Sequence, residues 1–428
     1  MNDFDVIVVG AGAAGLLAAA RSAERGLRTL LIEKNRKPGV KILMSGGSRC
    51  NLTQNTDRRG IVQAFGTQGR FLHSALAALG PADLVVLVAA EGVRTKIEPT
   101  GKIFPESDKA ADVLRAFTDR LARSGCVTHY SRPVTGLAPI ASGWRVESAG
   151  GQLTAGNVII AVGGKSYPGC GTTGDAYCWL ADLGHTIVAP RPSLVPLTSD
   201  AGWIRELSGV TLPDVGVSVV ARNQPGGTPV AVDARPPVDR GSFLFTHRGV
   251  SGPVVLNVSR GATALANSSA TLCCDFLPTI HAEELDRLTR DRTSQAGRKS
   301  IHGLFDDLLP RRLVESLWQQ SGVPMEQRGA DLTKAQRVAF VSAVKRCHIP
   351  VTGSLGFEKA EVTAGGISLD SVDSRTMCSR LHAGLYLAGE VLDLDGPIGG
   401  YNFQAAFSTA WLAANAIPLA IDAENLRA

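Results

Sequence analysis

The first fifteen residues place the strongest constraint on how this chain can fold. Asp5 to Val9 form a short β-branched run, and Gly10-Ala11-Gly12-Ala13-Ala14-Gly15 follows it directly. An Ala- and Leu-rich stretch then continues to Gly26, so the order strand, glycine turn and helix is predicted. In such a turn Gly10 permits the sharp bend, Gly12 lets the backbone approach a pyrophosphate, and Gly15 lets the helix pack on the strand. The N–H groups at the start of the helix then face the phosphates, which predicts a dinucleotide site.

A second strand and an acidic residue complete this motif. Arg28 to Ile32 form another apolar run, and Glu33 ends it. A carboxylate at about this offset accepts hydrogen bonds from a ribose hydroxyl in dinucleotide-binding domains. The alternative interpretation is an ordinary βαβ unit whose glycines serve packing alone.

Composition sets the number of domains and the kinds of partner. The chain has 428 residues, of which 44% are apolar and 19% charged, so two or three soluble domains are expected. The net charge is +5, and the basic residues are scattered apart from Arg36-Lys37 with Lys41 and Arg49, and Arg311-Arg312. This pattern suits a small anionic molecule at least as well as nucleic acid, which usually requires a basic face. We therefore expect a small-molecule substrate and no nucleic-acid partner.

The sequence favours a cytoplasmic protein with reduced cysteines. The N-terminus carries Asp3 and Asp5 in place of basic residues, and no run of ~18 apolar residues predicts a membrane span. The eight cysteines form no C-x-x-C pair and have no Cys/His spacing typical of zinc ligands. We expect packing thiols and no metal site.

Changes in composition and hydrophobic periodicity along the chain predict an α/β fold that is interrupted by an insert. Residues 1–192 alternate between strand and helix patterns, and residues 134–162 read as a small antiparallel meander. Residues 193–278 are rich in proline and short β-branched runs such as 215–220 and 230–232, which predicts a separate β-rich domain. Residues 279–350 have helical periodicity, and Gly-rich, strand-like character returns over 351–428. The simplest account is one nucleotide-binding domain in two parts, 1–192 and 351–428, around a β-rich and a helical domain.

Three features favour FAD over NAD. The strand at 157–162 ends in Gly163-Gly164, a late strand at 385–388 ends in Gly389-Glu390, and Gly399-Gly400-Tyr401-Asn402 opens a closing helix. Such a helix would direct its positive N-terminal end at an anion or at the flavin edge. FAD is longer than NAD and commonly needs this return of the chain. The alternative is that each glycine pair is a plain loop.

These blocks resemble a known family. The opening turn, Ser45-Gly46-Gly47-Ser48-Arg49-Cys50-Asn51, Gly163–Pro168, Leu244–Pro253 and Gly389–Phe403 occur in the order seen in HI0933-like, or YhiN-like, bacterial FAD-binding flavoproteins, a family with aminoacetone-oxidase-like members. The resemblance covers most of the chain. It implies a Rossmann-like FAD domain of the two-dinucleotide-binding type, with an inserted β-barrel-like domain and a small helical domain.

The resemblance also implies where FAD is bound. The cofactor-binding candidates are Gly10, Gly12, Ala13, Ala14, Gly15, Glu33, Lys34, Lys41, Gly46, Gly47, Arg49, Cys50, Asn51, Val134, Ala161, Gly163, Gly164, Gly389, Glu390, Asp393, Gly399, Gly400, Tyr401, Asn402 and Phe403. Val162, Ser242 and Ile398 depart from residues common in related flavoproteins, which leaves FAD binding intact and puts the substrate pocket in doubt.

The resemblance predicts an FAD-dependent oxidoreductase but leaves the reaction open. Family members have been linked to amine oxidation and to reduction of steroid-type enones. For this chain, NADH or NADPH is a candidate for a transient electron donor. One alternative is an FAD-containing flavoprotein that modifies or binds RNA, and another is a regulatory module that keeps FAD as structure. The sequence does not predict the oligomeric state.

The catalytic candidates are Arg49, Tyr167 and His247, and none is assigned a role. Lys41 or Arg49 could stabilise an anionic reduced flavin, or could contact the pyrophosphate. His247 could transfer protons near neutral pH, although a structural histidine is the better interpretation. Tyr167 and Tyr401 could donate to a substrate carbonyl, and Cys50 is expected to be a packing thiol. A second G-x-G-x-x-G motif, Gly169–Gly174, is read as a loop over the flavin because Pro168 makes a tight strand-to-helix turn improbable.

Overall fold

The computed structural model describes residues 2–221, 238–265, 270–301 and 303–419. The chain divides into two compact units. Unit 1 comprises Met1–Arg191 and Val362–Ala428, and unit 2 comprises Pro192–Glu361. The predicted finer division into four segments stays a prediction.

Unit 1 is built on a sheet whose centre is parallel. The strand order is β6-β2-β1-β9-β8-β7, and β19 also pairs with β9. The bounds are β1 (Phe4–Val9), β2 (Thr29–Ile32), β6 (Val127–His129), β7 (Val134–Ile140), β8 (Gly143–Ser148), β9 (Gly151–Ile160) and β19 (Leu385–Leu387). Strands β6, β2, β1, β9 and β19 pair in parallel, whereas β7, β8 and β9 form the predicted antiparallel meander. This is the predicted Rossmann-type α/β fold.

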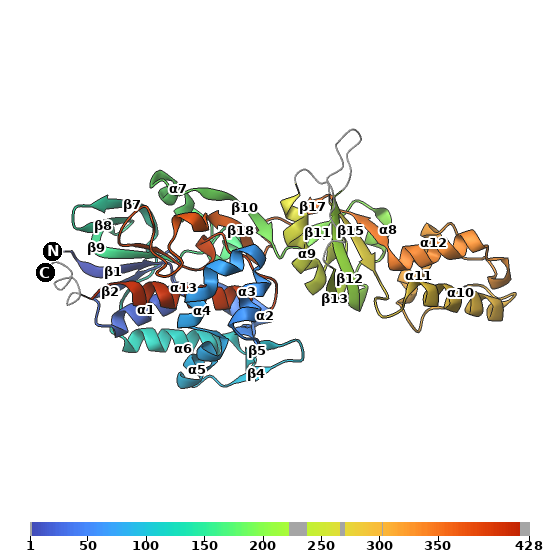
Figure 1. The fold of residues 1–428 in the computed structure, drawn as a ribbon, viewed down its shortest axis with the longest axis horizontal. Coiled ribbons are helices and arrows are strands. Elements are labelled where there is room, and N and C mark those ends of the chain that lie inside the picture. Colours follow the sequence, from blue (N-terminus) through green and yellow to red (C-terminus); the bar gives the residue numbers. More distant parts are fainter. Residues whose placement is uncertain (1, 222–237, 266–269, 302, 420–428) are drawn as a thin grey trace. The chain divides into compact units, whose positions relative to one another are not determined.

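Helices pack against this sheet and against one another (Figure 1). The bounds of the main ones are α1 (Ala13–Glu24), α6 (Ala110–Arg123) and α13 (Tyr401–Ala416). Helix α1 contacts both α6 and α13. Residues Val6–Val8 and Val158–Ile160 are fully buried, which explains why these parts of β1 and β9 are apolar at every position.

Shorter elements surround this core. They are α2 (Val40–Ser48), α3 (Arg58–Ala64), α4 (His73–Ala78), α5 (Pro81–Ala90) and α7 (Asp175–Asp182). A small sheet has the order β3 (Thr53–Gln54), β5 (Lys102–Pro105) and β4 (Thr95–Ile97), and β10 (Ile187–Ser193) pairs with β18 (Val362–Ile367). Among the described residues, no single helix is long and apolar enough to cross a membrane, although the bent pair Gly66–Ala78 and Pro81–Ala90 passes on length and composition.

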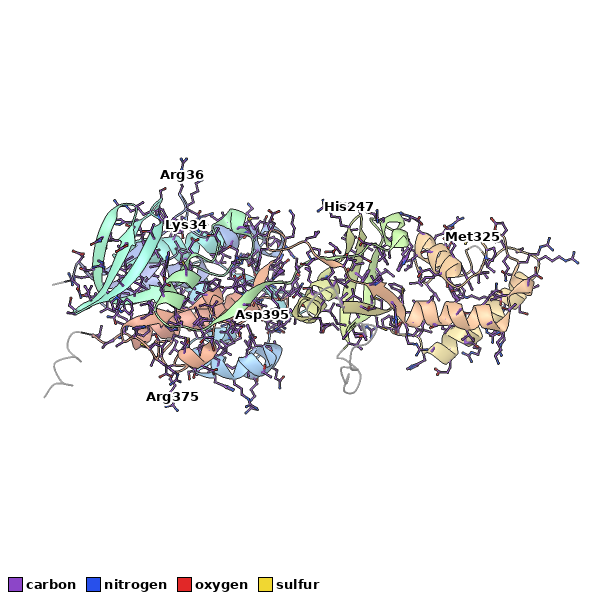
Figure 2. All side chains as sticks on the ribbon, turned by 90° about the horizontal axis from the view of Figure 1, so that it is seen from above. Lys34, Arg36, His247, Met325, Arg375 and Asp395 are labelled. Carbon is purple, nitrogen blue, oxygen red and sulfur yellow. The ribbon has the colours of Figure 1, made fainter. Side chains whose placement is uncertain are left out.

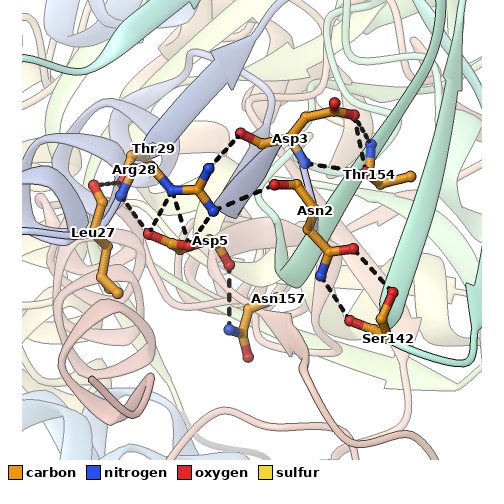
Figure 3. A network of polar contacts seen from close by, with 9 residues as sticks. All are labelled: Asn2, Asp3, Asp5, Leu27, Arg28, Thr29, Ser142, Thr154 and Asn157. Atoms are coloured by element: carbon orange, nitrogen blue, oxygen red, sulfur yellow. Dashed lines mark hydrogen bonds and ion pairs between the residues drawn. The ribbon is translucent and has the colours of Figure 1, made fainter. Parts of the chain in front are cut away.

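The start of β1 is held by a polar network (Figure 3). Arg28 donates from Nη2 to Asp5 Oδ1 at 2.7 Å and from Nη1 to the Asp3 carbonyl oxygen at 3.1 Å. Asp3 Oδ2 accepts from the Thr154 backbone N–H at 2.8 Å. These bonds join β1 to β2 and β9 at the amino end of the parallel strands, opposite to the end where the glycine turn begins.

Unit 2 combines an antiparallel sheet with helices. The sheet order is β16-β15-β12-β13-β14-β11-β17. The strands are β11 (Leu197–Thr198), β12 (Thr211–Ala221), β13 (Asp239–Thr246), β14 (Gly249–Ser251), β15 (Ala270–Asp275), β16 (Cys347–Pro350) and β17 (Gly353–Ser354). The helices are α8 (Gly202–Glu206), α9 (Pro253–Ala264), α10 (Ala282–Ala296), α11 (Arg311–Gln320) and α12 (Lys334–Lys345). The rings of Trp318 and Phe340 stack at 3.5 Å and join α11 to α12.

The predictions for the insert are confirmed only in part. The predicted strand at 215–220 lies within β12, whereas the predicted strand at 230–232 lies outside the described residues. The described strands form an open path from β16 to β17, and the barrel-like form expected for the insert is not confirmed.

Candidate functional site in unit 1

The glycine turn lies at the carboxyl end of β1. Gly10 has φ +99°, and a Cβ there would lie 2.7 Å from the carbonyl oxygen of Ala161. A Cβ on Gly15 would lie 1.7 Å from the Gly10 carbonyl oxygen, so the start of α1 packs directly on the turn. Gly12 has no other atom within 4 Å of an added Cβ. The first turn of α1 has neither a side-chain cap nor an acidic residue, so its N–H groups are available to an anion.

Glu33 is buried at the end of β2, and two backbone N–H groups fix the orientation of its carboxylate. Its Oε2 accepts from the Ala11 N–H at 2.6 Å, and its Oε1 accepts from the Asn35 N–H at 2.7 Å. A carboxylate has capacity for further hydrogen bonds, so a ribose hydroxyl could still donate to it. Lys34 instead pairs with Asp175 at 2.5 Å and donates to Thr173 at 2.6 Å. Figure 2 shows exposed Arg36 pointing out from the surface near Lys34.

Four polar residues from distant parts of the chain form a connected cluster. Lys41 Nζ donates to Glu390 Oε2 at 2.7 Å and to Ser166 Oγ at 2.8 Å. Ser166 Oγ donates to Glu390 Oε1 at 2.6 Å, and that oxygen also accepts from the Thr363 N–H at 2.9 Å. The Thr363 hydroxyl in turn accepts from the backbone N–H groups of Lys165 and Ser166. The cluster therefore ties α2, the loop after β9, β18 and the segment after β19 together.

Gly164 makes this convergence possible. A Cβ on Gly164 would lie 2.4 Å from Thr363 Oγ1 and 3.1 Å from Glu390 Oε1. Gly163 beside it has φ +77°, and Ala161 is buried. Val134, at the start of β7, is half-buried.

The loop Gly46–Asn51 follows an unusual backbone path. Gly46, Gly47, Ser48 and Cys50 all have positive φ, and strained backbone of this kind clusters at functional sites. Cys50 is fully buried, and burial raises the pKa of its thiol to about 12. With its amide nitrogen facing the carbonyl oxygens of Thr53 and Ile103, Asn51 accepts from the Gly400 N–H at 3.0 Å. The early loop is thus bonded to the C-terminal segment.

The C-terminal segment meets the glycine turn directly. Gly389 has φ +76°, and a Cβ there would lie 3.1 Å from Ala14 Cβ in α1. Gly400, with φ +90°, lies so close to Thr53 that a Cβ would come within 2.6 Å of its backbone. Gly399 and Gly400 lead into α13, whose N-terminus has no side-chain cap.

Asn402 and its neighbours hold this loop in shape. Asn402 accepts from the Gly396 N–H at 2.8 Å and donates to the Gly396 carbonyl oxygen at 3.0 Å. Tyr401 is half-buried, and Phe403 stacks on Phe407. Asp393 Oδ1 accepts from the Gly365 N–H at 3.1 Å, and burial raises the pKa of Asp393.

Three residues of this region were not predicted from the sequence. Ser166 stands inside the block Gly163–Pro168, so a search for hydroxyls in that block could have found it, and Thr363 stands just before the glycine pair Gly365-Gly366. Tyr177 in α7 carried no such signal. Its phenol oxygen is buried without a hydrogen-bond partner among the described residues, and burial, followed by the charges of Glu390 and Asp393, raises its pKa.

Of the three catalytic candidates, Arg49 and Tyr167 lie in unit 1 and His247 lies in unit 2. The Arg49 guanidinium bonds Glu98 at 2.6 Å and lies 4.0 Å over the Phe104 ring, so its charge is engaged away from the Lys41 cluster. Tyr167 has φ +58°, a strained conformation, and its carbonyl oxygen accepts from the Thr172 hydroxyl at 3.2 Å. His247 is exposed in the turn between β13 and β14 of unit 2 (Figure 2).

The residues of unit 1 fit an FAD molecule. The open space at Gly12, the uncapped N-terminus of α1 and the oriented Glu33 match the needs of a pyrophosphate and a ribose. The Lys41–Glu390 cluster offers both a cation and acceptor oxygens, and the uncapped start of α13 offers further N–H groups. Residues more than 300 positions apart along the sequence would hold the two halves of the cofactor.

Comparison with known proteins agrees with this geometry. A family model described as the HI0933-like protein Rossmann domain matches residues 4–416. The chain is 33% identical over 418 residues to a ribosomal RNA dihydrouridine synthase of Escherichia coli (strain K12), covering 97% of this chain and 98% of that protein. It is 29% identical over 413 residues to a 3-dehydro-bile acid delta(4,6)-reductase of Clostridium scindens, covering 96% and 98%.

A solved structure shows a similar fold. The 3-ketosteroid delta1-dehydrogenase of Sterolibacterium denitrificans matches with a TM-score of 0.51 and 16% identity, over 97% of this chain and 99% of that one. At this identity the match is evidence of fold alone. From the family match and the full-length relatives, the chain belongs to the HI0933-like family and is an FAD-dependent oxidoreductase.

Proposed function

We propose that this chain reduces a carbon–carbon double bond conjugated to a carbonyl group, and that the bond is C5=C6 of a uracil base in ribosomal RNA. The observation that carries the proposal is the full-length similarity, at 33% identity, to a protein named as a ribosomal RNA dihydrouridine synthase. A uracil and an unsaturated 3-oxo steroid share the same reacting unit, so the similarity to the bile acid reductase supports the same type of reduction.

Reduction of a conjugated double bond requires a hydride, a proton and a source of electrons. Reduction adds a hydride to the β carbon and a proton to the α carbon of the conjugated unit. A bound FAD supplies the hydride-transfer chemistry, and NADH or NADPH is the proposed source of the electrons. The glycine turn and Glu33 would hold the nucleotide portion, because these groups are shaped for a pyrophosphate and a ribose.

The Lys41 cluster would serve the other half of the cofactor. Lys41 is held by Glu390 and Ser166, so its ammonium group has a defined position. A fixed cation near the flavin favours a reduced, anionic ring. Both cations are ion-paired, Lys41 with Glu390 and Arg49 with Glu98 and Asp108. We assign that role to Lys41 because it lies in the cluster that joins both ends of the chain, whereas the partners of Arg49 lie outside that cluster.

A second candidate substrate is a steroid-type enone, which the 29% identical bile acid reductase favours. None of the relatives reported above is named for amine oxidation, so that reaction is retained only as a control. An RNA substrate contradicts the expectation, drawn from the scattered basic residues, that nucleic acid is not a partner. Assays with RNA and with a steroid distinguish the two possibilities.

Anaerobic assays with purified, FAD-loaded protein test the proposal. The protein is incubated with NADH or NADPH and with an unmodified ribosomal RNA transcript, a 3-oxo-Δ4 steroid or a primary amine. The expected result is a nucleoside with the mass gain of two hydrogen atoms in digests of the RNA, and loss of that product in Lys41→Met. Reduction of the steroid alone would replace the RNA substrate by the second candidate, and oxidation of the amine alone would overturn the proposal.

A further inference from the structure

One end of the helical part of unit 2 brings basic side chains together from two separate segments. Helix α10 ends at Ala296, and the chain after it pairs with the segment around Arg328 through a β-bridge between Ser300 and Arg328. The Gly329 N–H donates to the Lys299 carbonyl oxygen at 3.0 Å. The Ala330 N–H donates to the Gly297 carbonyl oxygen at 2.9 Å. These bonds fix the two segments side by side.

Gly329 brings Arg328 close to the last turn of α10. A Cβ on Gly329 would lie 2.4 Å from the Thr293 carbonyl oxygen and 3.0 Å from Ala296 Cβ. Only a glycine allows this approach without a shift of the backbone. Arg328 therefore belongs to the same end of the helix as Arg298 and Lys299.

Four exposed cations define this basic tip: Arg290, Arg298, Lys299 and Arg328. Asp291 lies 3.9 Å from the Arg290 guanidinium. In the part of the chain that the structure describes, no acidic oxygen lies within 4.0 Å of the charged groups of Arg298, Lys299 or Arg328. By contrast, Arg292 in α10 and Arg337 in α12 pair with Asp307 at 2.6 Å and with Asp286 at 2.8 Å. Three of the four cations of the tip, Arg298, Lys299 and Arg328, therefore have no ion pair among the described residues, and the acidic residues Glu326 and Asp331 flank Arg328 only in sequence.

Helix polarity explains only part of this arrangement. Cations at the C-terminus of a helix offset its dipole, and this accounts for Arg298 and Lys299, which follow the end of α10. It does not account for Arg328, which a separate segment supplies at the cost of a required glycine. Unpaired guanidinium and ammonium groups on one surface are the usual electrostatic footprint for phosphates.

We propose that the basic tip binds the phosphate backbone of the RNA substrate. This inference rests on the proposed function. The tip supplies affinity without base specificity, because guanidinium and ammonium groups contact phosphates in any sequence. It gives the reductase an RNA-binding surface outside unit 1.

The test measures RNA affinity against salt in the full-length, FAD-loaded protein. The probe is an unmodified ribosomal RNA transcript. The tip variant carries Arg290→Gln, Arg298→Gln, Lys299→Gln and Arg328→Gln. The control carries Arg59→Gln, Lys109→Gln, Lys359→Gln and Arg375→Gln, which removes the same charge from exposed positions outside the tip. A third variant, Arg290→Lys, Arg298→Lys and Arg328→Lys, keeps the charge and checks that the tip still folds.

We expect the tip variant to lower the magnitude of the slope of log K against log salt by about 3 to 4, since it removes four charges and each phosphate contact contributes about 0.7 to 0.9. The control and the lysine variant should keep the wild-type slope. An unchanged slope in the tip variant, or an equal fall in the control, overturns the inference.

Reduction of the RNA, of free uridine and of a steroid enone is measured in parallel. If the tip variant still reduces RNA with the wild-type KM, the inference that the tip binds RNA is wrong and the proposed function is unaffected. If RNA binds through the tip in a salt-dependent way but no conjugated double bond is reduced, RNA binding by the tip is supported and the proposed reductase function is wrong.

Discussion

At the scale of single residues, the site depends on atoms that leave no room for a side chain. Gly164 lies between Thr363 and Glu390, and an added Cβ would displace one of them. The sequence identified Gly164 through its motif, but it could not show that Ser166 and Thr363 share the Glu390 carboxylate. It also could not reveal that Arg49 is engaged by Glu98 and Phe104, because those partners lie about 50 residues away along the chain.

Gly164→Val should weaken FAD binding at least about tenfold, or about 1.4 kcal/mol, because the valine displaces the Thr363 hydroxyl and the Glu390 carboxylate. Fluorescence titration with FAD measures the change. Gly202→Val is the matched control, since an added Cβ there has no atom within 4 Å and the residue lies in unit 2. Equal affinity in the two variants would show that the cluster does not serve the cofactor.

The Cys50 thiol should not react in the folded protein. Burial raises its pKa to about 12, so almost no thiolate exists at pH 8. Treatment with iodoacetamide followed by peptide mass spectrometry should label exposed Cys178 and spare Cys50. Rapid labelling of Cys50 would restore the idea of a redox thiol in this loop.

At the scale of elements, polar residues lock the connections between helices and strands. His185, just before β10, is buried between two hydroxyls: its Nδ1 lies 2.9 Å from Ser371 Oγ and its Nε2 lies 3.0 Å from Ser379 Oγ. The strands and helices of unit 1 followed from apolar periodicity and turn residues, as for α6 and for the meander of β7, β8 and β9. Contacts between elements, such as those of His185, could not be predicted from the sequence, because a hydroxyl partner 186 or 194 positions away leaves no local sequence pattern.

His185 should make the stability of the protein depend on pH. Burial, with a smaller contribution from the charge of His382, lowers the pKa of His185 below its ordinary 6.5. The unfolded chain then binds a proton more readily than the folded one, so stability is full above about pH 6.5 and falls as the pH decreases below it. Urea unfolding between about pH 5 and 7.5 should show this fall in the wild type and a flatter profile in His185→Gln. Identical profiles would contradict the neutral, buried assignment.

At the scale of the whole molecule, the two ends of the sequence build one nucleotide-binding unit, and unit 2 is inserted between them. The sequence predicted this return from the late Gly389-Glu390 and Gly399-Gly400 blocks, and the contacts of Gly389 with Ala14 and of Lys41 with Glu390 confirm it. The substrate could not be predicted in the same way. Scattered net charge hides a local cluster such as the basic tip, which exists only after residues 298 and 328 are folded together.

The titration of cofactor-free protein with FAD tests most directly whether both ends of the chain hold one cofactor. The wild type should bind one FAD per chain. Gly389→Val, which would press on Ala14 of the opening helix, should bind FAD much more weakly while its thermal unfolding remains cooperative. A wild-type protein that takes up no FAD, or a folded Gly389→Val variant with unchanged affinity, would contradict the account.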